Sequence, residues 1–580
     1  MKKLIVQVIT AAFLLPSAYL HAQSQTSDVI RYGDVRHPVR DRQGMIASSN
    51  ILASEVGARV LAEGGTAVDA AVAVGFALAV VRPRAGNIGG GGFMMFYSAA
   101  DGETIAIDYR ESAPTRATRD MFLDENGEVD AQKARFSHLS SGVPGTVAGL
   151  HFAHEKFGRL PWKRLVAPAI KLAREGFKVS YDMSNALERS RERMARDPSS
   201  IEYFYKSATE GYQPGERIVQ SDLAWSLNQI AEHGPDAFYR GEVAKKIIAE
   251  MELGGGLVDA QSLAAYKPVV REPVRGSYRG YEIVSMPPSS SGGVHVIQML
   301  NILEHFPVRE FGAESADNVH LLVEVAKLAY ADRSKHLGDL DFYDVPIDWL
   351  TSKEYARELA AGIDMQRARP SVEIAPGIAP AGESVDTTHF SVIDRDGNMV
   401  ANTFTLNLSF GSGMTVDGAG FLLNNEMDDF SSKPGVPNTF GLIGGTANAI
   451  EAGKRPLSSM TPTMVFKDGE PVLSTGSPGG SRIIMAVLQM VVNVIDHEMN
   501  IGVASNAPRM HHQWLPDMLR IESGFSPDTI TELQRRGHTI TGGRTIGNVN
   551  SVSQEDGYFL GAADPRRPGG GAVGPTTLRD

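Results

Sequence analysis

Cysteine is absent from this chain of 580 residues. Its absence excludes disulfide bonds, zinc–thiolate sites, iron–sulfur clusters and cysteine nucleophiles. Positive charge is also scarce, since 56 Lys and Arg residues face 68 Asp and Glu residues and the net charge is -12. A chain this acidic lacks the broad basic surface that binding to a nucleic-acid backbone requires. We therefore expect an oxygen or nitrogen nucleophile in any covalent chemistry, and no nucleic-acid partner.

Apolar runs long enough to cross a membrane are also lacking. Residues 67–81 form an internal run of 15 residues that contains Asp69, whereas a membrane-spanning helix needs roughly 20 apolar residues. The run of residues 4–15 follows two lysines and precedes small residues, which is the pattern of a secretory signal peptide. It is too short for the alternative, an uncleaved membrane anchor. We predict a signal peptide over residues 1–22, no stable membrane span and a periplasmic location, with secretion into the medium as the alternative.

Hydrophobic and charged residues, at 42% and 21%, are close to ordinary globular usage. From about residue 150 to 375, apolar residues recur three and four positions apart, which predicts a mostly helical layer. Residues 369–384 are rich in Pro, Ala, Gly and Glu, as is typical of an exposed, mobile linker. Residues 389–413 then form two strand-like runs around a hairpin signal, Asp396-Gly397. Strands and helices alternate beyond this point, so we expect one layered α/β body.

A glycine-rich segment, NIGGGG over residues 87–92, leads into the apolar run FMMFY. Paired glycines allow the backbone to approach another backbone or a ligand closely. A phosphate-binding loop is disfavoured, because neither the P-loop lysine nor a G-x-G-x-x-G spacing is present. We interpret the segment as a structural turn that feeds a buried strand.

His511 and His512 are adjacent and could suggest a metal site. Adjacent side chains in a strand or loop tend to point apart, and no carboxylate has the usual spacing of a metal ligand. We predict neither a metal site nor a cofactor.

The segment DTTHF, residues 386–390, lies where the linker meets the first predicted strand. A threonine hydroxyl is a weak nucleophile and needs a base. Cleavage before Thr387 would free its own α-amino group, whose ordinary pKa of about 8 leaves a useful neutral fraction. A threonine pair at the start of a strand is by itself more often structural, because threonine favours strands. The nucleophile hypothesis therefore depends on further motifs.

Further motifs follow this one in order along the chain. They are GNIGGGGF, IDYRESAP, DTTHFSVIDRDGNMVANTFTLN, GFLLNNEMDDFS, KRPLSSMTPT, STGSPGGSRI and NAPRMHHQWLPD. With them the chain resembles the γ-glutamyltranspeptidases, members of the N-terminal-nucleophile hydrolase superfamily, over nearly its whole length after the signal peptide. The resemblance implies an αββα sandwich and a precursor that cuts itself between Asp386 and Thr387. A large subunit of residues 23–386 and a small, catalytic subunit of residues 387–580 would then form a heterodimer.

The resemblance also implies roles for residues around the nucleophile. Thr387 attacks, and Thr405 assists it; without the resemblance Thr405 would be an ordinary strand threonine. The adjacent backbone amides of Gly479 and Gly480 form an oxyanion hole, for which glycine is suited because no Cβ blocks the approach. A plain tight turn is the competing interpretation of this pair.

Substrate binding is implied by a second set of residues. A γ-glutamyl group carries a carboxylate and an ammonium on one carbon, so its pocket needs a cationic fork and several acceptors. By resemblance Arg110 binds the carboxylate together with Ser458 and Ser459, and the ammonium is bound by Asn407, Glu426 and Asp429. Some relatives have Gln where this chain has Glu426, and an exposed acidic turn is the alternative for the two acids. Residues 433–445 match a lid, with Phe440 where relatives can carry Tyr.

The activity implied by the resemblance is that of a γ-glutamyltransferase and glutathione hydrolase. The γ-glutamyl group of glutathione or another γ-glutamyl compound passes to the enzyme and then to water, an amino acid or a dipeptide. One alternative is a related acylase, such as a glutaryl-cephalosporin acylase, which keeps the nucleophile but binds an acyl group without an ammonium. Another is an exported binding protein that never cleaves itself.

Overall fold

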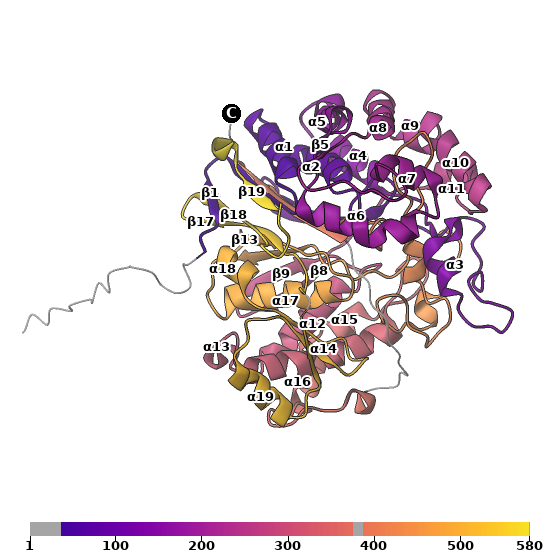
Figure 1. Cartoon of the computed structure of the whole chain (residues 1–580). Helices are drawn as coiled ribbons and strands as arrows, with labels where there is room; N and C mark the ends of the chain where they lie inside the picture. Colours follow the sequence, from indigo (N-terminus) through magenta and orange to yellow (C-terminus); the bar gives the residue numbers. More distant parts are fainter. Residues whose placement is uncertain (1–35, 375–386, 544, 579–580) are drawn as a thin grey trace, which may run out of the picture.

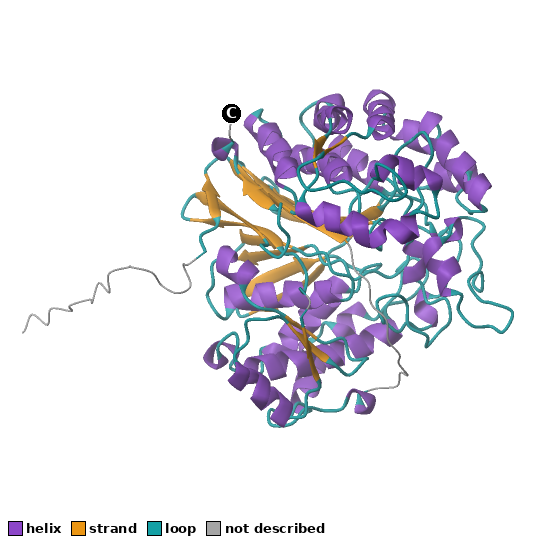
Figure 2. Ribbon diagram, viewed as in Figure 1, coloured by secondary structure: helices purple, strands orange, loops and turns teal. Residues whose placement is uncertain are grey.

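The computed structural model describes residues 36–374, 387–543 and 545–578. The predicted signal peptide, Asp386 and most of the predicted linker lie outside the described residues. Two seven-stranded sheets face each other between two layers of helices (Figures 1 and 2). The predicted αββα sandwich is confirmed.

The first sheet contains the predicted nucleophile strand near its middle, and every neighbouring pair of strands is antiparallel. Its strands come from both sides of position 387, so the chain on each side contributes to one sheet. In spatial order they are β19 (Gly571–Val573), β2 (Gly44–Ser48), β10 (Thr387–Asp394), β11 (Met399–Thr405), β3 (Gly91–Ser98), β4 (Glu103–Tyr109) and β7 (Val269–Arg271).

The second sheet is likewise antiparallel and is also built from both parts of the chain. Its strands in spatial order are β1 (Val39–Asp41), β18 (Tyr558–Ala563), β17 (Asn550–Glu555), β13 (Glu470–Thr475), β12 (Thr463–Lys467), β9 (Tyr281–Ser285) and β8 (Val274–Tyr278). Two small sheets complete the strands: β14 (Met510–His511) with β15 (Leu519–Ile521) and β16 (Ile540–Gly542), and β5 (Phe177–Lys178) with β6 (Arg217–Ile218).

One helical layer packs on the first sheet, at the top of Figure 1. Its inner helix α2 is apolar on all sides and is buried along its whole length, and Thr66 and Asp69 cap its start reciprocally. The helices of this half are α1 (Ile51–Ala62), α2 (Ala67–Val81), α3 (Ala131–Phe136), α4 (Thr146–Phe157), α5 (Trp162–Glu175), α6 (Tyr181–Met194), α7 (Pro198–Phe204), α8 (Ser221–His233), α9 (Pro235–Tyr239), α10 (Glu242–Gly254) and α11 (Ala260–Ala265).

The other helical layer covers the second sheet, at the bottom of Figure 1. Helices α12 and α17 lie against each other there, and α12 also packs on β8 and β9. The helices of this half are α12 (Gly292–Leu303), α13 (Val308–Phe311), α14 (Ala316–His336), α15 (Ile347–Leu350), α16 (Lys353–Ala361), α17 (Arg482–Ile495), α18 (Ile501–Asn506) and α19 (Pro527–Arg535). The predicted helical character of the region from 150 to 375 is confirmed.

The predicted hairpin forms as β10 and β11, joined by a turn in which Gly397 has a φ of 86°. Alternate side chains of β10 face opposite ways. Phe390 belongs to the core beneath α2, whereas Ser391 donates a hydrogen bond to the Asn550 carbonyl of the other sheet at 3.0 Å. Because Thr387 is four residues before Ser391, the period-2 rule directs its side chain to the space between the sheets.

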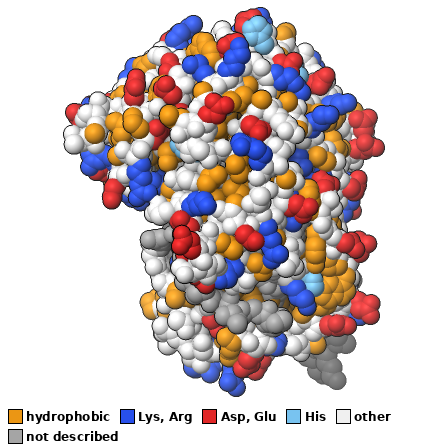
Figure 3. All heavy atoms as spheres, turned by 90° about the vertical axis from the view of Figure 1, so that its right-hand side faces the viewer, with side chains coloured by type: hydrophobic (Ala, Val, Ile, Leu, Met, Phe, Trp, Pro, Cys, Tyr) orange, Lys and Arg blue, Asp and Glu red, His pale blue; other side chains and the backbone are white. Residues whose placement is uncertain are grey.

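Acidic and basic side chains alternate over the face shown in Figure 3, and that face carries no broad basic patch among its described residues. No helix within the described ranges is both long and apolar enough to span a membrane.

The glycine-rich turn before β3 is structural, as predicted. A Cβ on Gly90 would overlap the carbonyl oxygen of Thr405, and one on Gly92 would overlap that of Thr403. The backbone of this turn therefore lies directly against the end of β11, and glycine is required by close approach.

We expect Gly90→Ala to lower the free energy of unfolding by about 1 to 3 kcal/mol, because the added methyl group displaces the end of β11. Gly362→Ala is the matched control: Gly362 has a φ of -89°, and its Cβ would meet only the Leu359 carbonyl oxygen, at 3.5 Å. Urea unfolding followed by circular dichroism measures both variants. Equal midpoints for the two would contradict this account of the turn.

Candidate active site

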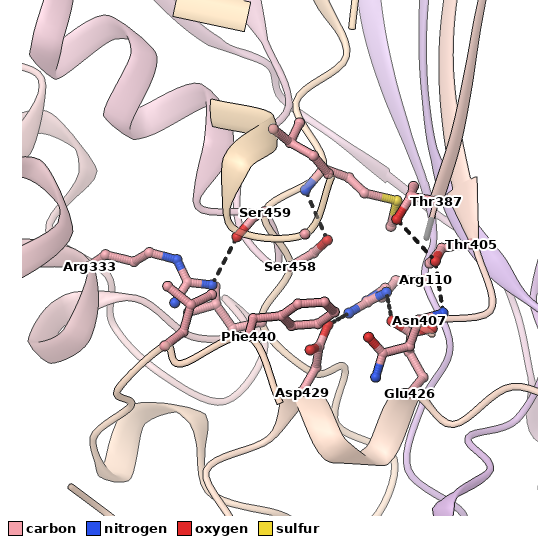
Figure 4. A pocket seen from close by; sticks show the side chains of 15 residues that line it. Arg110, Arg333, Thr387, Thr405, Asn407, Glu426, Asp429, Phe440, Ser458 and Ser459 are labelled. Atoms are coloured by element: carbon pink, nitrogen blue, oxygen red, sulfur yellow. Dashed lines mark hydrogen bonds and ion pairs between the residues drawn. The ribbon is translucent and has the colours of Figure 1, made fainter. Parts of the chain in front are cut away.

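A small cavity lies between the sheets at the start of β10 (Figure 4). Ten of the predicted site residues line it: Arg110, Thr387, Thr405, Asn407, Glu426, Asp429, Phe440, Ser458, Ser459 and Gly480. Gly479 is next to Gly480 but does not line the cavity itself. The lining also includes residues that the sequence did not single out, namely Arg333, Leu442, Leu457, Met460 and Ile483.

Thr387 and Thr405 are direct neighbours in the β10–β11 ladder. Their hydroxyl oxygens are 3.3 Å apart, and the Thr405 oxygen also accepts a hydrogen bond from the backbone N–H of Asn407 at 2.7 Å. Asn407 has a φ of 73°, a left-handed conformation that asparagine adopts more readily than most residues. This turn after β11 therefore fixes Thr405 beside the predicted nucleophile.

Arg110 is at the centre of the buried charges and is only 1% exposed. It pairs with Glu426 through Nη1, and its Nη2 is 2.5 Å from an oxygen of Asp429. A third acid, Glu111, has an oxygen 3.6 Å from Nη1. The short 3₁₀ turn Glu426–Asp429 brings its two carboxylates onto one guanidinium, so these acids do not form an exposed acidic turn.

Several acceptors in this cluster have no donor. Asn407 Oδ1, Glu426 Oε2 and both carboxyl oxygens of Glu111 are buried and make no hydrogen bond to any residue that the structure describes. Buried polar atoms are almost always paired, and an unpaired one costs free energy. Asn407 and Glu426 line the cavity, so a ligand with several N–H donors would complete their hydrogen bonds.

Burial sets the protonation of the acids. Loss of solvent raises the pKa of Glu426 well above its ordinary range although Arg110 opposes the rise, and it raises the pKa of Glu111 to about 7. The pKa of Asp429 is also raised, mainly by burial. Burial therefore shifts all three carboxyl groups toward their protonated forms, and the Arg110 guanidinium opposes that shift.

Hydroxyl groups occupy the opposite side of the cavity. The backbone N–H of Met460 donates to Ser458 Oγ at 3.1 Å, and Arg333 Nη2 donates to Ser459 Oγ at 3.2 Å. The Ser458 N–H in turn donates to the Ser289 carbonyl at 2.8 Å, which ties this segment to the turn before α12.

Phe440 belongs to the predicted lid, residues 433–445, and its side chain covers one side of the cavity. Asn438 Nδ2 donates to an Asp429 oxygen at 3.2 Å, and the Phe440 carbonyl accepts from Gln513 Nε2 at 3.0 Å. Gly480 has a φ of 55°, and a Cβ there would press on the Phe440 ring. Glycine at this position thus allows the aromatic ring to lie against the backbone.

The adjacent histidines have different partners, as expected. His511 pairs with Gln513 and His512 with Asp517. Another group, His320, Glu324 and His538, brings three possible metal ligands together on buried side chains.

The side chains of this group already contact one another or a lysine. His320 and His538 share a hydrogen bond of 2.7 Å, and Lys327 pairs with Glu324 at 2.6 Å. A cation would have to displace that lysine, so we assign no site there.

Glu111 and Arg333 are the site residues that sequence reasoning missed. Glu111 directly follows Arg110 in DYRESAP, and its sequence position could have suggested the pairing. Arg333 lies in the last turn of α14, where a cation is ordinarily explained by solvent exposure or by the helix dipole.

The raised pKa of Glu111 predicts a pH dependence of stability. The folded state binds this proton more tightly than the unfolded state, whose carboxyl has a pKa of about 4.5. The contribution is present below pH 4.5 and is lost as pH rises through about 7. Glu111→Gln stays uncharged, so we expect it to gain about 1 to 3 kcal/mol of stability over the wild type between pH 5 and 8.

Urea midpoints at the two pH values test this expectation, with the exposed Glu125→Gln as the matched control. Parallel pH profiles for wild type and Glu111→Gln would show that the buried carboxyl does not carry the proton.

Three known proteins are similar to this chain over most of its length. The glutathione hydrolase proenzyme of Escherichia coli (strain K12) is 52% identical, and the match covers 97% of each chain. An acylase ACY 1 proenzyme of Pseudomonas sp. (strain SE83) is 39% identical over 92% of this chain and 94% of its own. The crystal structure of a cephalosporin acylase from Bacillus halodurans superposes with a TM-score of 0.82 at 27% identity, covering 93% of this chain and 97% of that one.

The family comparison spans both sides of the predicted cleavage site. The family model described as Gamma-glutamyltranspeptidase matches residues 53–574, which include all the cavity-lining residues. With the αββα fold and the Thr387–Thr405 pair beside a buried cation and its acids, this match shows that the chain belongs to the γ-glutamyltranspeptidase family.

Proposed function

We propose that this protein is a self-processing γ-glutamyltransferase and glutathione hydrolase. The observation that carries the proposal is the cavity in which the threonine pair meets the Arg110 guanidinium, two acids and two serine hydroxyls. The charged groups and hydroxyls match the carboxylate and the ammonium that the α-carbon of a γ-glutamyl donor carries. The threonines lie beside the position that the reacting carbonyl would take.

Processing is proposed to begin with Thr387. Its hydroxyl attacks the carbonyl carbon of Asp386, the peptide nitrogen leaves as the α-amine of Thr387, and water hydrolyses the resulting ester. The product has a large subunit of residues 23–386 and a small subunit of residues 387–580. The freed amine then serves as the base that accepts the hydroxyl proton in each turnover.

Substrate binding is proposed as an exchange of ion pairs. The donor carboxylate replaces an acid on Arg110 and takes hydrogen bonds from Ser458 and Ser459, while the donor ammonium takes the released acids. Asn407 Oδ1 and Glu426 Oε2, which lack donors in the described structure, would accept from that ammonium. Because each charge that takes part in the exchange keeps an opposite partner, the exchange avoids most of the cost of desolvating an unpaired charge.

The acyl transfer then follows in two steps, formation and cleavage of an ester on Thr387. Thr387 Oγ forms an ester with the γ-carbonyl carbon, the amide nitrogen of the donor leaves as an amine, and N–H groups of Gly479 and Gly480 stabilise the oxyanion. Both glycines have positive φ, 145° and 55°, which suits a tight turn of adjacent amides. Water cleaves the ester to release glutamate, or the amine of an amino acid or dipeptide takes the γ-glutamyl group.

The acylase alternative is supported by the relative and the solved structure of that name. A glutaryl group has no ammonium, however, and would leave the unpaired acceptors of Asn407 and Glu426 unsatisfied. This argument favours a γ-glutamyl donor over a glutaryl donor.

For the same chain we propose export through a signal peptide over residues 1–22 and a periplasmic location.

We expect wild-type protein to give two fragments by intact mass, one beginning near residue 23 and one at Thr387. Thr387→Ala should remain one chain and lose more than about 1,000-fold in turnover of γ-glutamyl-p-nitroanilide, because nucleophile and base are both lost. Thr387→Ser keeps a hydroxyl and should split and react slowly. A Thr387→Ala chain that splits and turns over substrate would remove Thr387 from the mechanism.

Donor choice gives a second test. We expect kcat/KM for γ-glutamyl-p-nitroanilide to exceed that for glutaryl-p-nitroanilide by about 100-fold, and Asp429→Asn to reduce this ratio about 10-fold by removing a charge that faces the ammonium.

Asp428→Asn is the matched control, because Asp428 pairs with Arg135 instead of Arg110. It should leave the ratio near that of the wild type. A wild-type preference for the glutaryl donor would favour the acylase alternative.

A further inference from the structure

Arg333 is a buried cation of the cavity that the mechanism above does not use. Its side chain is 4% exposed, and no carboxylate of the described residues lies within 4 Å of it. Instead its Nε donates to Ser291 Oγ at 2.9 Å and its Nη2 to Ser459 Oγ at 3.2 Å. A buried charge without an ion-pair partner is costly, so its position calls for an explanation from function.

The hydrogen bonds of the two serines have a definite direction. Guanidinium and backbone N–H groups can only donate, so Ser459 Oγ accepts from Arg333 and Ser458 Oγ accepts from Met460. Neither hydroxyl proton has an acceptor among the described residues. Both are therefore left to donate to a ligand, and Figure 4 shows the two hydroxyls on the same side of the cavity as Arg333.

The charge balance distinguishes the two arginines. Arg110 is surrounded by the carboxyl groups of Glu426, Asp429 and Glu111, so its charge already has acidic partners. Arg333 interacts electrostatically with Asp429 at a distance longer than that of an ion pair. Loss of solvent lowers the pKa of Arg333 to about 10, so the guanidinium stays charged at neutral pH. The net positive potential on the hydroxyl side of the cavity therefore comes from Arg333.

We propose that Arg333 is a positioning and specificity-determining residue for the carboxylate end of the ligand. It holds Ser459 as an acceptor so that the serine hydroxyl donates into the cavity, and its charge attracts the carboxylate to the two serines. Helix α14 is suited to this role, because Tyr330, one turn before Arg333, donates a hydrogen bond to the Ser481 carbonyl beside Gly480. The proposal rests on the proposed function only for the identity of the ligand.

The test compares ligands with and without an α-carboxylate. For Arg333→Met we expect KM for γ-glutamyl-p-nitroanilide to rise about 30-fold, with at most about a 3-fold change for 4-aminobutanoyl-p-nitroanilide, which lacks only that carboxylate. Slow donors are measured in single turnover with enzyme in excess. Arg333→Lys retains the charge and should recover part of the loss.

Arg509→Met is the matched control, since Arg509 is an equally buried arginine that pairs with Asp564 away from the cavity. Its effects should be equal for the two donors. Subunit gels and thermal unfolding monitor the folding of every variant.

Titration calorimetry with L-glutamate and 4-aminobutanoate separates this inference from the proposed function. Weaker glutamate binding by Arg333→Met supports the role of Arg333 even if wild-type protein does not turn over γ-glutamyl donors. Equal losses for both ligands, or no loss for glutamate, would overturn the proposal.

Discussion

The antiparallel pairing of β10 with β11 is the constraint on which the site depends. Its register places Thr387 opposite Thr405, and the turn at Asn407 then fixes the Thr405 oxygen by a backbone hydrogen bond. A shift of one residue would direct Thr387 into the core beneath α2, because neighbouring side chains face opposite sides of a sheet. The tight approach of Gly90 to Thr405 resists such a shift, so a turn without catalytic groups still protects the geometry of the nucleophile.

A second constraint is the uneven distribution of acidic and basic side chains in the cavity. Arg110 faces three acids, while the direct partners of Arg333 within the part of the chain that the structure describes are two serine hydroxyls. The cavity thus contains one region rich in carboxyl groups and another with an uncompensated positive charge. A ligand that carries an ammonium and a carboxylate on one carbon offsets both, whereas a ligand with a single charge leaves one of them uncompensated. This polarity explains why orphaned acceptors and an unpaired guanidinium are tolerated in the same site.

Sequence patterns predicted much of this architecture, including the helical region from 150 to 375, the β10–β11 hairpin and the glycine turn, because local periodicity and turn chemistry determine them. The motifs also gathered nearly all the cavity residues. Arg333 was missed because the exposure of a helical cation depends on what packs against that face, which local spacing does not reveal. Pairing between Arg110 and the acids was likewise not predicted, since residues more than 300 positions apart become neighbours only through the arrangement of strands.

The intermixing of strands bears on how a cut chain could keep its site. In the first sheet, β10 lies between β11 and β2, and β19 pairs with the other side of β2. A cut before Thr387 falls at the first residue of β10 and therefore breaks no interstrand hydrogen bond within that strand. Separation of the two pieces, in contrast, would expose the edges of both sheets and the apolar surface between them. The sheet topology thus allows a new chain end to be created beside Thr405 while the surrounding groups, contributed by both pieces, remain in position.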